Sequence, residues 1–258
     1  MSEKNRDGKR NARQRLAAER EKQKSADKRR RALIVGVSVV GVLGLAAVIG
    51  VVAANAGKDK GGKSAGPVVA PSGAQGKDSL AVPVGKEGAK STLTVWEDFR
   101  CPACQSFETR YRSTLHELTD AGKLRVEYHL VRLIDGNMGG TGSLHSANAA
   151  ACAQDAGKFR EYHDVLFANQ PPETDDAFAD NGKLIDLAGK VEGLDTPAFR
   201  SCVKDGTHNS WVDRSQQAFA SGGFGGTPTV LFGGKNIYQD QSMTPEKLKE
   251  MVESADRG

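Results

Sequence analysis

The chain has 258 residues, enough for one ordinary globular domain or two small ones with appendages. Its 36 Lys+Arg and 32 Asp+Glu side chains are unevenly placed, because residues 1–32 hold 13 basic and 5 acidic ones and the remainder carries a net charge of −4. This distribution excludes a basic nucleic-acid-binding domain, since the positive charge is confined to one short arm. Four cysteines are too few for a small disulfide scaffold, and 30 glycines without a Gly-X-Y period exclude collagen.

Residues 33–54, LIVGVSVVGVLGLAAVIGVVAA, contain no charged side chain. A helix of this length spans about 30 Å, the thickness of the hydrocarbon core of a bilayer. Basic residues at 28–31 precede it directly, and by the positive-inside rule that end stays in the cytoplasm. The sequence therefore predicts a single-pass signal anchor in the cell membrane, a cytoplasmic basic tail over 1–32 and an extracytoplasmic C-terminal part. A cleaved signal peptide is the alternative, because Ala54-Asn55-Ala56 fits an A-x-A cleavage site, and either possibility exports the domain.

Beyond the apolar segment, the composition separates a linker from a folded domain. Residues 55–77 consist mainly of Gly, Ala, Ser, Pro and Lys, which is typical of a flexible linker. The folded domain is expected over 78–258. Its expected elements are a strand at 93–96, a helix from the Cys-x-x-Cys motif to about 118, a strand at 124–133, helices within about 142–219, strands at 229–232 and 236–238, and a helix opened by Thr244-Pro245-Glu246. This order indicates an α/β domain with a helical insertion.

The motif Cys101-Pro102-Ala103-Cys104 at the start of the first helix carries the chemistry. Side chains at positions i and i+3 share one helix face, so the two sulfurs lie close enough to form a disulfide. Cys101 faces unpaired backbone N–H groups and the positive end of the helix dipole, and both lower the pKa of a thiol. Cys104 lies one turn deeper and is expected to be the buried resolving thiol. We therefore predict a redox pair in which a substrate thiolate attacks Cys101 and Cys104 leaves.

Half of a zinc site is the alternative interpretation of the Cys-x-x-Cys motif. A structural zinc site needs two more ligands, usually as a second close pair. The remaining cysteines, Cys152 and Cys202, lie 50 positions apart, and the five histidines, at 116, 129, 145, 163 and 208, show no ligand spacing. We therefore expect no metal, and we expect each histidine to be a surface or partly packed residue.

Three segments resemble those of the DsbA-like thiol-disulfide oxidoreductases. They are WEDFRCPACQSF at 96–107, FREYHDVLFANQ at 159–170 and GGTPTV at 225–230, and they occur in the family's order. The resemblance covers about residues 78–256. It implies a thioredoxin fold with an inserted helical domain at about 142–219, preceded here by the single transmembrane helix.

The resemblance also implies further features of the site. Pro228 would follow a cis peptide bond beside the cysteine pair, where Thr227 offers main-chain hydrogen bonds to an extended substrate peptide. The substrates would be exported proteins with free thiols, and a membrane quinone-linked thiol oxidase would regenerate the disulfide. No organic cofactor is implied, because the redox-active disulfide itself serves.

Two departures from the family pattern affect the expected chemistry. An acidic residue often lies six positions before the first cysteine and handles the proton of the resolving thiol, but here that position is Val95. Glu97, on the same strand face, and Asp98 are the candidates to replace it. The strongest oxidants of the family carry Pro-His between the cysteines, where this chain has Pro-Ala. We therefore predict a reduction potential between thioredoxin's, at about −270 mV, and DsbA's, at about −120 mV.

Cys152 and Cys202 lie in two helical stretches of the insertion. Because exported chains rarely keep idle thiols, we expect them to form a structural disulfide. The alternatives are two buried free cysteines, or a shuttle that exchanges with the active pair.

Together these patterns predict an extracytoplasmic, membrane-tethered thiol-disulfide oxidoreductase that donates disulfides to exported proteins. Two alternatives stay open. One is a disulfide reductase or isomerase, and the other is a redox-inactive module that binds peptides along the edge formed by Thr227 and Pro228.

Overall fold

The structure, a computed structural model, describes residues 67–257. The basic tail, the transmembrane helix and most of the linker predicted from the sequence lie outside the described residues. Within the described part of the chain, no helix is both long and apolar enough to cross a membrane.

Five strands form one mixed sheet in the order β1-β3-β2-β4-β5. The strands are β1 (Val82–Val84), β2 (Ser91–Glu97), β3 (Leu124–Leu130), β4 (Thr229–Phe232) and β5 (Lys235–Asn236). β2 and β3 run parallel, while the β1–β3, β2–β4 and β4–β5 pairs are antiparallel. β2 is therefore the central strand, and its C-terminal end delivers the chain to the cysteine motif.

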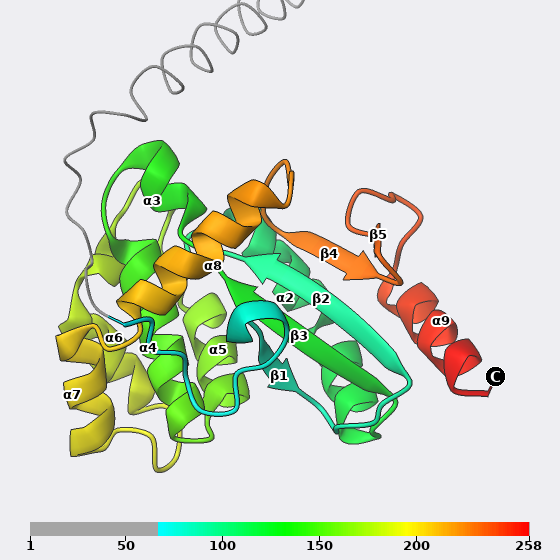
Figure 1. Cartoon of the computed structure of the whole chain (residues 1–258), viewed down its shortest axis with the longest axis horizontal. Helices are drawn as coiled ribbons and strands as arrows, with labels where there is room; N and C mark the ends of the chain where they lie inside the picture. The colour runs from blue at the N-terminus through cyan, green and yellow to red at the C-terminus, as the bar shows by residue number, and fades with distance from the viewer. Residues whose placement is uncertain (1–66, 258) are drawn as a thin grey trace, which may run out of the picture. The chain divides into compact units, whose positions relative to one another are not determined.

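The two faces of β2 pack against different helices because successive side chains in a strand alternate between faces. Helix α2 (Pro102–Asp120) covers the face that carries Val95 and Glu97, and helix α9 (Pro245–Arg257) packs beside α2 and β2. On the other face, Trp96 stacks on His129 and packs against Phe219 of helix α8 (Asn209–Ser221). In Figure 1, α8 crosses in front of the strands and α9 lies at the opposite end of the sheet from the insertion.

The stretch between β3 and β4 is helical. It contains α3 (Leu133–Met138), α4 (Gly142–Asp155), α5 (Phe159–Ala168), the short helix η2 (Ala177–Ala179), α6 (Asn181–Ala188), α7 (Pro197–Asp205) and α8. Figure 1 shows α4, α5, α6 and α7 gathered beside one end of the sheet. The alanine-rich helix α4 is the centre of this group, since it contacts α5, α6, α7 and α8. Small side chains there let its neighbours approach closely, and the group shares one apolar core with the sheet.

The segment before β1 differs from the sequence-based expectation. Residues 67–77 were predicted as the end of a flexible linker, yet they are bonded to the insertion. The backbone N–H of Ser72 donates to Asp155 (2.7 Å), and the carbonyl of Val69 lies 2.8 Å from Nδ1 of His208. A short helix, η1 (Lys77–Ser79), then leads into β1. The composition of this segment predicted flexibility. Its ordering could not be recognised from the segment itself, because the hydrogen-bond partners lie more than 80 residues away.

Candidate active site

Helix α2 begins at the cysteine motif, as the sequence predicts. Cys101 is the N-cap residue with an extended backbone (φ −77°, ψ 117°), and Pro102 occupies the first helical position. Proline suits this position because its fixed φ is helical and its missing N–H would be unpaired anyway. Cys101 is 6% exposed and Cys104 is fully buried one turn later. Both are reduced in this structure.

The two thiols have opposite acidities. A hydrogen bond from the Cys104 thiol lowers the pKa of Cys101 to about 6, and the backbone N–H groups of Ala103 and Cys104 act in the same direction. Burial raises the pKa of Cys104 well above its usual value, and the negative charge of Cys101 raises it further. At neutral pH the pair therefore holds a thiolate at Cys101 and a neutral thiol at Cys104.

The loop before β4 lies against Cys101. Trp96 at the end of β2 pairs with Thr229 at the start of β4, so the two residues before Thr229 meet the start of α2. The Thr227–Pro228 peptide bond is cis, and the thiol of Cys101 lies 3.3 Å from the carbonyl oxygen of Thr227. The structure thus brings together four of the residues singled out in the sequence, although 126 positions separate Cys101 from Thr227.

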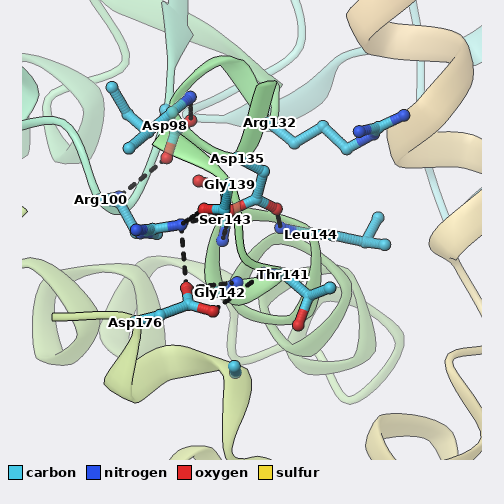
Figure 2. Close-up of polar contacts among 12 residues, drawn as sticks. Asp98, Arg100, Arg132, Asp135, Gly139, Thr141, Gly142, Ser143, Leu144 and Asp176 are labelled. Atoms are coloured by element: carbon cyan, nitrogen blue, oxygen red, sulfur yellow. Dashed lines mark hydrogen bonds and ion pairs between the residues drawn. The ribbon is translucent and has the colours of Figure 1, made fainter. Parts of the chain in front are cut away.

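Arg100, the residue before Cys101, is a buried cation at the centre of a polar network (Figure 2). Its Nη1 atom lies 2.7 Å from Asp135 and 2.9 Å from Asp176. Asp135 also accepts the N–H groups of Ser143 and Leu144 in the first turn of α4 (2.9 Å each). The guanidinium therefore ties the approach to Cys101 to the start of α4, and a buried charge in this position requires such partners.

Asp98 lies at the edge of the same network. One carboxylate oxygen accepts the N–H of Arg100 and the other accepts the N–H of Ile134 in the first turn of α3, both at 2.8 Å. Burial raises the pKa of Asp98 to about 7, although these two N–H groups pull it down. The Asp98 side chain therefore shapes the turn that leads to Cys101 and fixes α3 to it.

Glu97 lies beneath α2 in a buried cluster with Glu108 and His163. Oε1 of Glu97 is 2.7 Å from Nε2 of His163, and both side chains are almost completely buried. Burial by itself lowers the pKa of His163, but the carboxylates around it, Glu97 foremost, raise the value to about 10. Burial raises the pKa of Glu108 to about 8. At neutral pH His163 is therefore an imidazolium bonded to Glu97, beside a protonated Glu108 carboxyl.

The ligand atoms of Glu97, Glu108 and His163 lie within 4.8 Å of one another, so this cluster could hold a cation. Its charge is already balanced, however, because His163 is protonated and bonded to Glu97. Cys152, Cys202 and His208 also lie together, but the two sulfurs are bonded to each other at 2.03 Å. That disulfide links α4 to α7, and thiolate ligands are not present there.

The expectation that each histidine is a surface or partly packed residue is wrong for three of them, which are buried. His163 and His208 are 2% and 1% exposed, and His129, stacked on Trp96, is 8% exposed. His163 is enclosed by the rings of Phe99, Tyr128, Phe159 and Phe167. Spacing along the chain gave no sign of this, because the partners come from separate elements. Arg100, Asp135 and Asp176 were missed for the same reason.

The family model described as "Thioredoxin" matches residues 78–254. The chain belongs to this family. Its DsbA-like character is seen in two solved structures from Mycobacterium tuberculosis. The reduced form of the disulfide bond oxidoreductase DsbG is 27% identical (TM-score 0.59), with 69% of this chain and 88% of that chain covered. Reduced DsbA is 26% identical (TM-score 0.60), with 69% and 93% covered. The predicted α/β thioredoxin fold with a helical insertion is confirmed.

A curated relative of different architecture also matches. The serine/threonine-protein kinase PknE of Mycobacterium tuberculosis is 28% identical over 170 residues, which cover 62% of this chain. The chain spans about 30% of the length of that relative. The similarity therefore concerns one part of the kinase only.

Proposed function

We propose that this protein is an extracytoplasmic thiol-disulfide oxidoreductase that donates disulfides to exported proteins through Cys101 and Cys104. The observation that carries the proposal is that the pKa values of two thiols in one helical turn are shifted in opposite directions. The pKa of Cys101 is lowered to about 6, while that of Cys104 is raised well above its usual value. A stabilised Cys101 thiolate favours the reduced pair, and this preference makes the corresponding disulfide an oxidant.

The exchange proceeds in two displacements. A substrate thiolate attacks the Cys101 sulfur of the oxidised pair, the bond between Cys101 and Cys104 breaks, and Cys104 leaves as a thiolate that takes up a proton. A second substrate thiolate then attacks the substrate sulfur of the mixed disulfide and releases Cys101 as a thiolate. The substrate loses two electrons as its disulfide forms, and the cysteine pair gains them.

We assign the proton of Cys104 to Glu97 rather than to Asp98. Besides burial and the charge of Cys101, the charge of Glu97 raises the pKa of Cys104, so the carboxylate lies within electrostatic reach of the thiol. Both oxygens of Asp98 already accept backbone N–H groups, which suits a structural role. Glu97 is in turn held by His163, whose position fixes the carboxylate under α2.

We propose that an unfolded client lies across two surfaces beside the cysteines. Thr227 offers its main chain to an extended peptide next to the attacking sulfur, and Pro228 has no N–H that would compete. A hollow of about 400 Å³ lies between α2 and the loop before α9, lined in part by Phe107, Tyr111 and Tyr238. Burial, and then the charges of the two cysteines, raise the pKa of Tyr238, so this hollow borders the redox pair. Aromatic walls suit the apolar side chains of an unfolded protein.

The proposed setting is the outer side of the cell membrane, with residues 33–54 as the anchor, 1–32 in the cytoplasm and 55–66 as linker. The disulfide between Cys152 and Cys202 supports export, because such bonds persist in oxidising compartments. A membrane quinone-linked thiol oxidase would reoxidise the reduced pair. No organic cofactor takes part in the proposed exchange.

Reduced, unfolded ribonuclease tests the proposal. The oxidised domain should restore ribonuclease activity, and Cys101→Ser and Cys104→Ser should each abolish the effect, because neither variant can form the internal disulfide that oxidises the substrate thiols. Cys152→Ala combined with Cys202→Ala is the matched control and should retain activity. Binding of the unfolded substrate without any thiol oxidation would instead support the redox-inactive peptide-binding module.

The direction of exchange is tested by the reduction potential. We predict a value between about −270 and about −120 mV, because Pro102-Ala103 lacks the imidazole carried by the strongest oxidants. Equilibration with a glutathione series measures it. A potential at or below that of thioredoxin would favour the reductase or isomerase alternative.

A further inference from the structure

Gln170, in the insertion, binds the backbone of the turn that leads into Cys101. This residue follows α5, and its Nε2 atom donates to the carbonyl oxygens of Phe99 (2.8 Å) and Cys101 (3.0 Å). The two carbonyls belong to the Phe99–Arg100 and Cys101–Pro102 peptide groups, so one amide nitrogen holds the chain on both sides of the Arg100–Cys101 segment. Gln170 is half-buried, in a region where water competes only partly for these bonds.

A second glutamine makes the reciprocal connection. Gln105, in the first turn of α2, donates from Nε2 to the carbonyl oxygen of Phe167 in the last turn of α5 (2.9 Å). The end of α5 and the start of α2 are thus cross-linked in both directions. On the far side of the turn, the ion pairs of Arg100 hold the same segment to α4 (Figure 2).

The carbonyl of Cys101 has a particular role in the helix. It accepts the N–H of Gln105 at 3.2 Å and is therefore the first acceptor of α2, while Gln170 donates to the same oxygen. The direction of this carbonyl sets ψ of Cys101, and ψ sets how the N-cap side chain lies against the first turn of α2. The sulfur lies 3.3 Å from the carbonyl oxygen of Thr227. The Cys104 side chain is the main cause that lowers the pKa of the Cys101 thiol, and the N–H groups of Ala103 and Cys104 act in the same direction.

We propose that Gln170 is a positioning residue for the nucleophile: by holding the carbonyls of Phe99 and Cys101, it keeps the Cys101 sulfur in place beside Cys104 and the carbonyl of Thr227. The inference rests on the proposed function for its purpose, since a positioned thiolate is what the exchange uses. It adds a role to the helical insertion, which here positions the Cys101 thiol as well as packing against the sheet.

Replacing Gln170 with methionine tests this role. Gln170→Met keeps the length of the side chain but donates no hydrogen bond, so the pH midpoint of Cys101 ionisation should rise by about one unit, or about tenfold in acidity. The midpoint is measured from thiolate absorbance and from the pH dependence of iodoacetamide alkylation in the reduced domain. The matched control is Gln154→Met, because Gln154 also donates to a distant backbone carbonyl, that of Ser72 at 2.9 Å. Its midpoint should equal that of the wild type.

A purely structural role for Gln170 predicts a different result. The free energy of unfolding of Gln170→Met would fall while the ionisation midpoint stayed at the wild-type value, and that result would overturn the proposal. If the methionine variant does not fold, Gln170→Leu serves, because leucine cannot donate a hydrogen bond and adds no charge that would itself raise the midpoint. An unchanged midpoint in the leucine variant equally contradicts the proposal.

These measurements do not depend on turnover. A wild-type domain that fails to oxidise ribonuclease would refute the proposed function, whereas a shifted midpoint in Gln170→Met would still support the positioning role. Conversely, full ribonuclease oxidation by the wild type with no shift in the variant would refute the positioning role alone.

Discussion

Replacing Cys101 with serine should remove a pH-dependent part of the stability of the reduced domain. The pKa of this thiol falls from 9.0, its ordinary value, to about 6 in the folded protein. A folded-state pKa below the unfolded one stabilises the fold fully above the unfolded value, and the contribution is lost as the pH falls through about 6. With about 1.4 kcal/mol per unit, the contribution is about 1 kcal/mol at pH 7 and nearly 3 kcal/mol at pH 8.

The assay is urea unfolding of the reduced wild type and of Cys101→Ser between pH 5 and pH 8. Fluorescence of Trp96 and Trp211 reports unfolding, and mass spectrometry checks that the disulfide between Cys152 and Cys202 stays intact during reduction. The difference in the free energy of unfolding between the two proteins should grow with pH over this range. The oxidised wild type is the control, because its Cys101 sulfur cannot ionise.

A difference that stays flat from pH 5 to pH 8 would refute the reasoning, because it would mean that folding does not change the acidity of Cys101. The same result would remove the reason for treating the disulfide as an oxidant. The extra stability of the reduced domain and the oxidising power of the Cys101–Cys104 disulfide reflect the same free-energy difference. Unfolding measures it in one experiment and thiol exchange in another.

Three further predictions follow from contacts away from the sulfur pair. Removing the disulfide with Cys152→Ala and Cys202→Ala should lower the free energy of unfolding by about 4 kcal/mol in the chain-entropy model, because the bond closes a loop of 50 positions. Urea unfolding measures this change, and a loss below about 1 kcal/mol would contradict the prediction. His163 should remain an imidazolium from pH 6 to pH 8, since its pKa is raised to about 10, and the stabilisation from its charge is lost only as the pH rises through that value. A ¹⁵N chemical-shift titration with a midpoint near 6.5 would disprove this. Arg100→Met should cost about 3 to 5 kcal/mol in chemical denaturation, because it leaves the buried Asp135 carboxylate without its cation. Arg132→Met, which breaks a more exposed pair, should cost less than about 1 kcal/mol. Equal costs would show that burial of the Arg100–Asp135 pair does not decide the loss.

The sequence by itself determined the chemistry of the cysteine pair and the order of the elements. Cys101 and Cys104 are three positions apart at a helix start marked by Pro102, so their shared face and the N–H groups behind Cys101 follow from local geometry. The order of strands and helices followed from apolar periodicity in the same way, except for β1, which the sequence analysis did not predict. These features depend on neighbours within one or two turns, and such neighbours are visible in the chain itself.

The long-range partners were decided by the tertiary structure. Glu97 meets His163 across 66 positions, and Gln170 reaches the carbonyl of Cys101 across 69. The sequence could propose Glu97 as a proton group, but it gave no sign that His163 is buried beside it. Only packing of the insertion against the sheet brings these groups into a medium where water is excluded. There an unpaired charge or carbonyl costs several kcal/mol, so the identity of its partner becomes decisive.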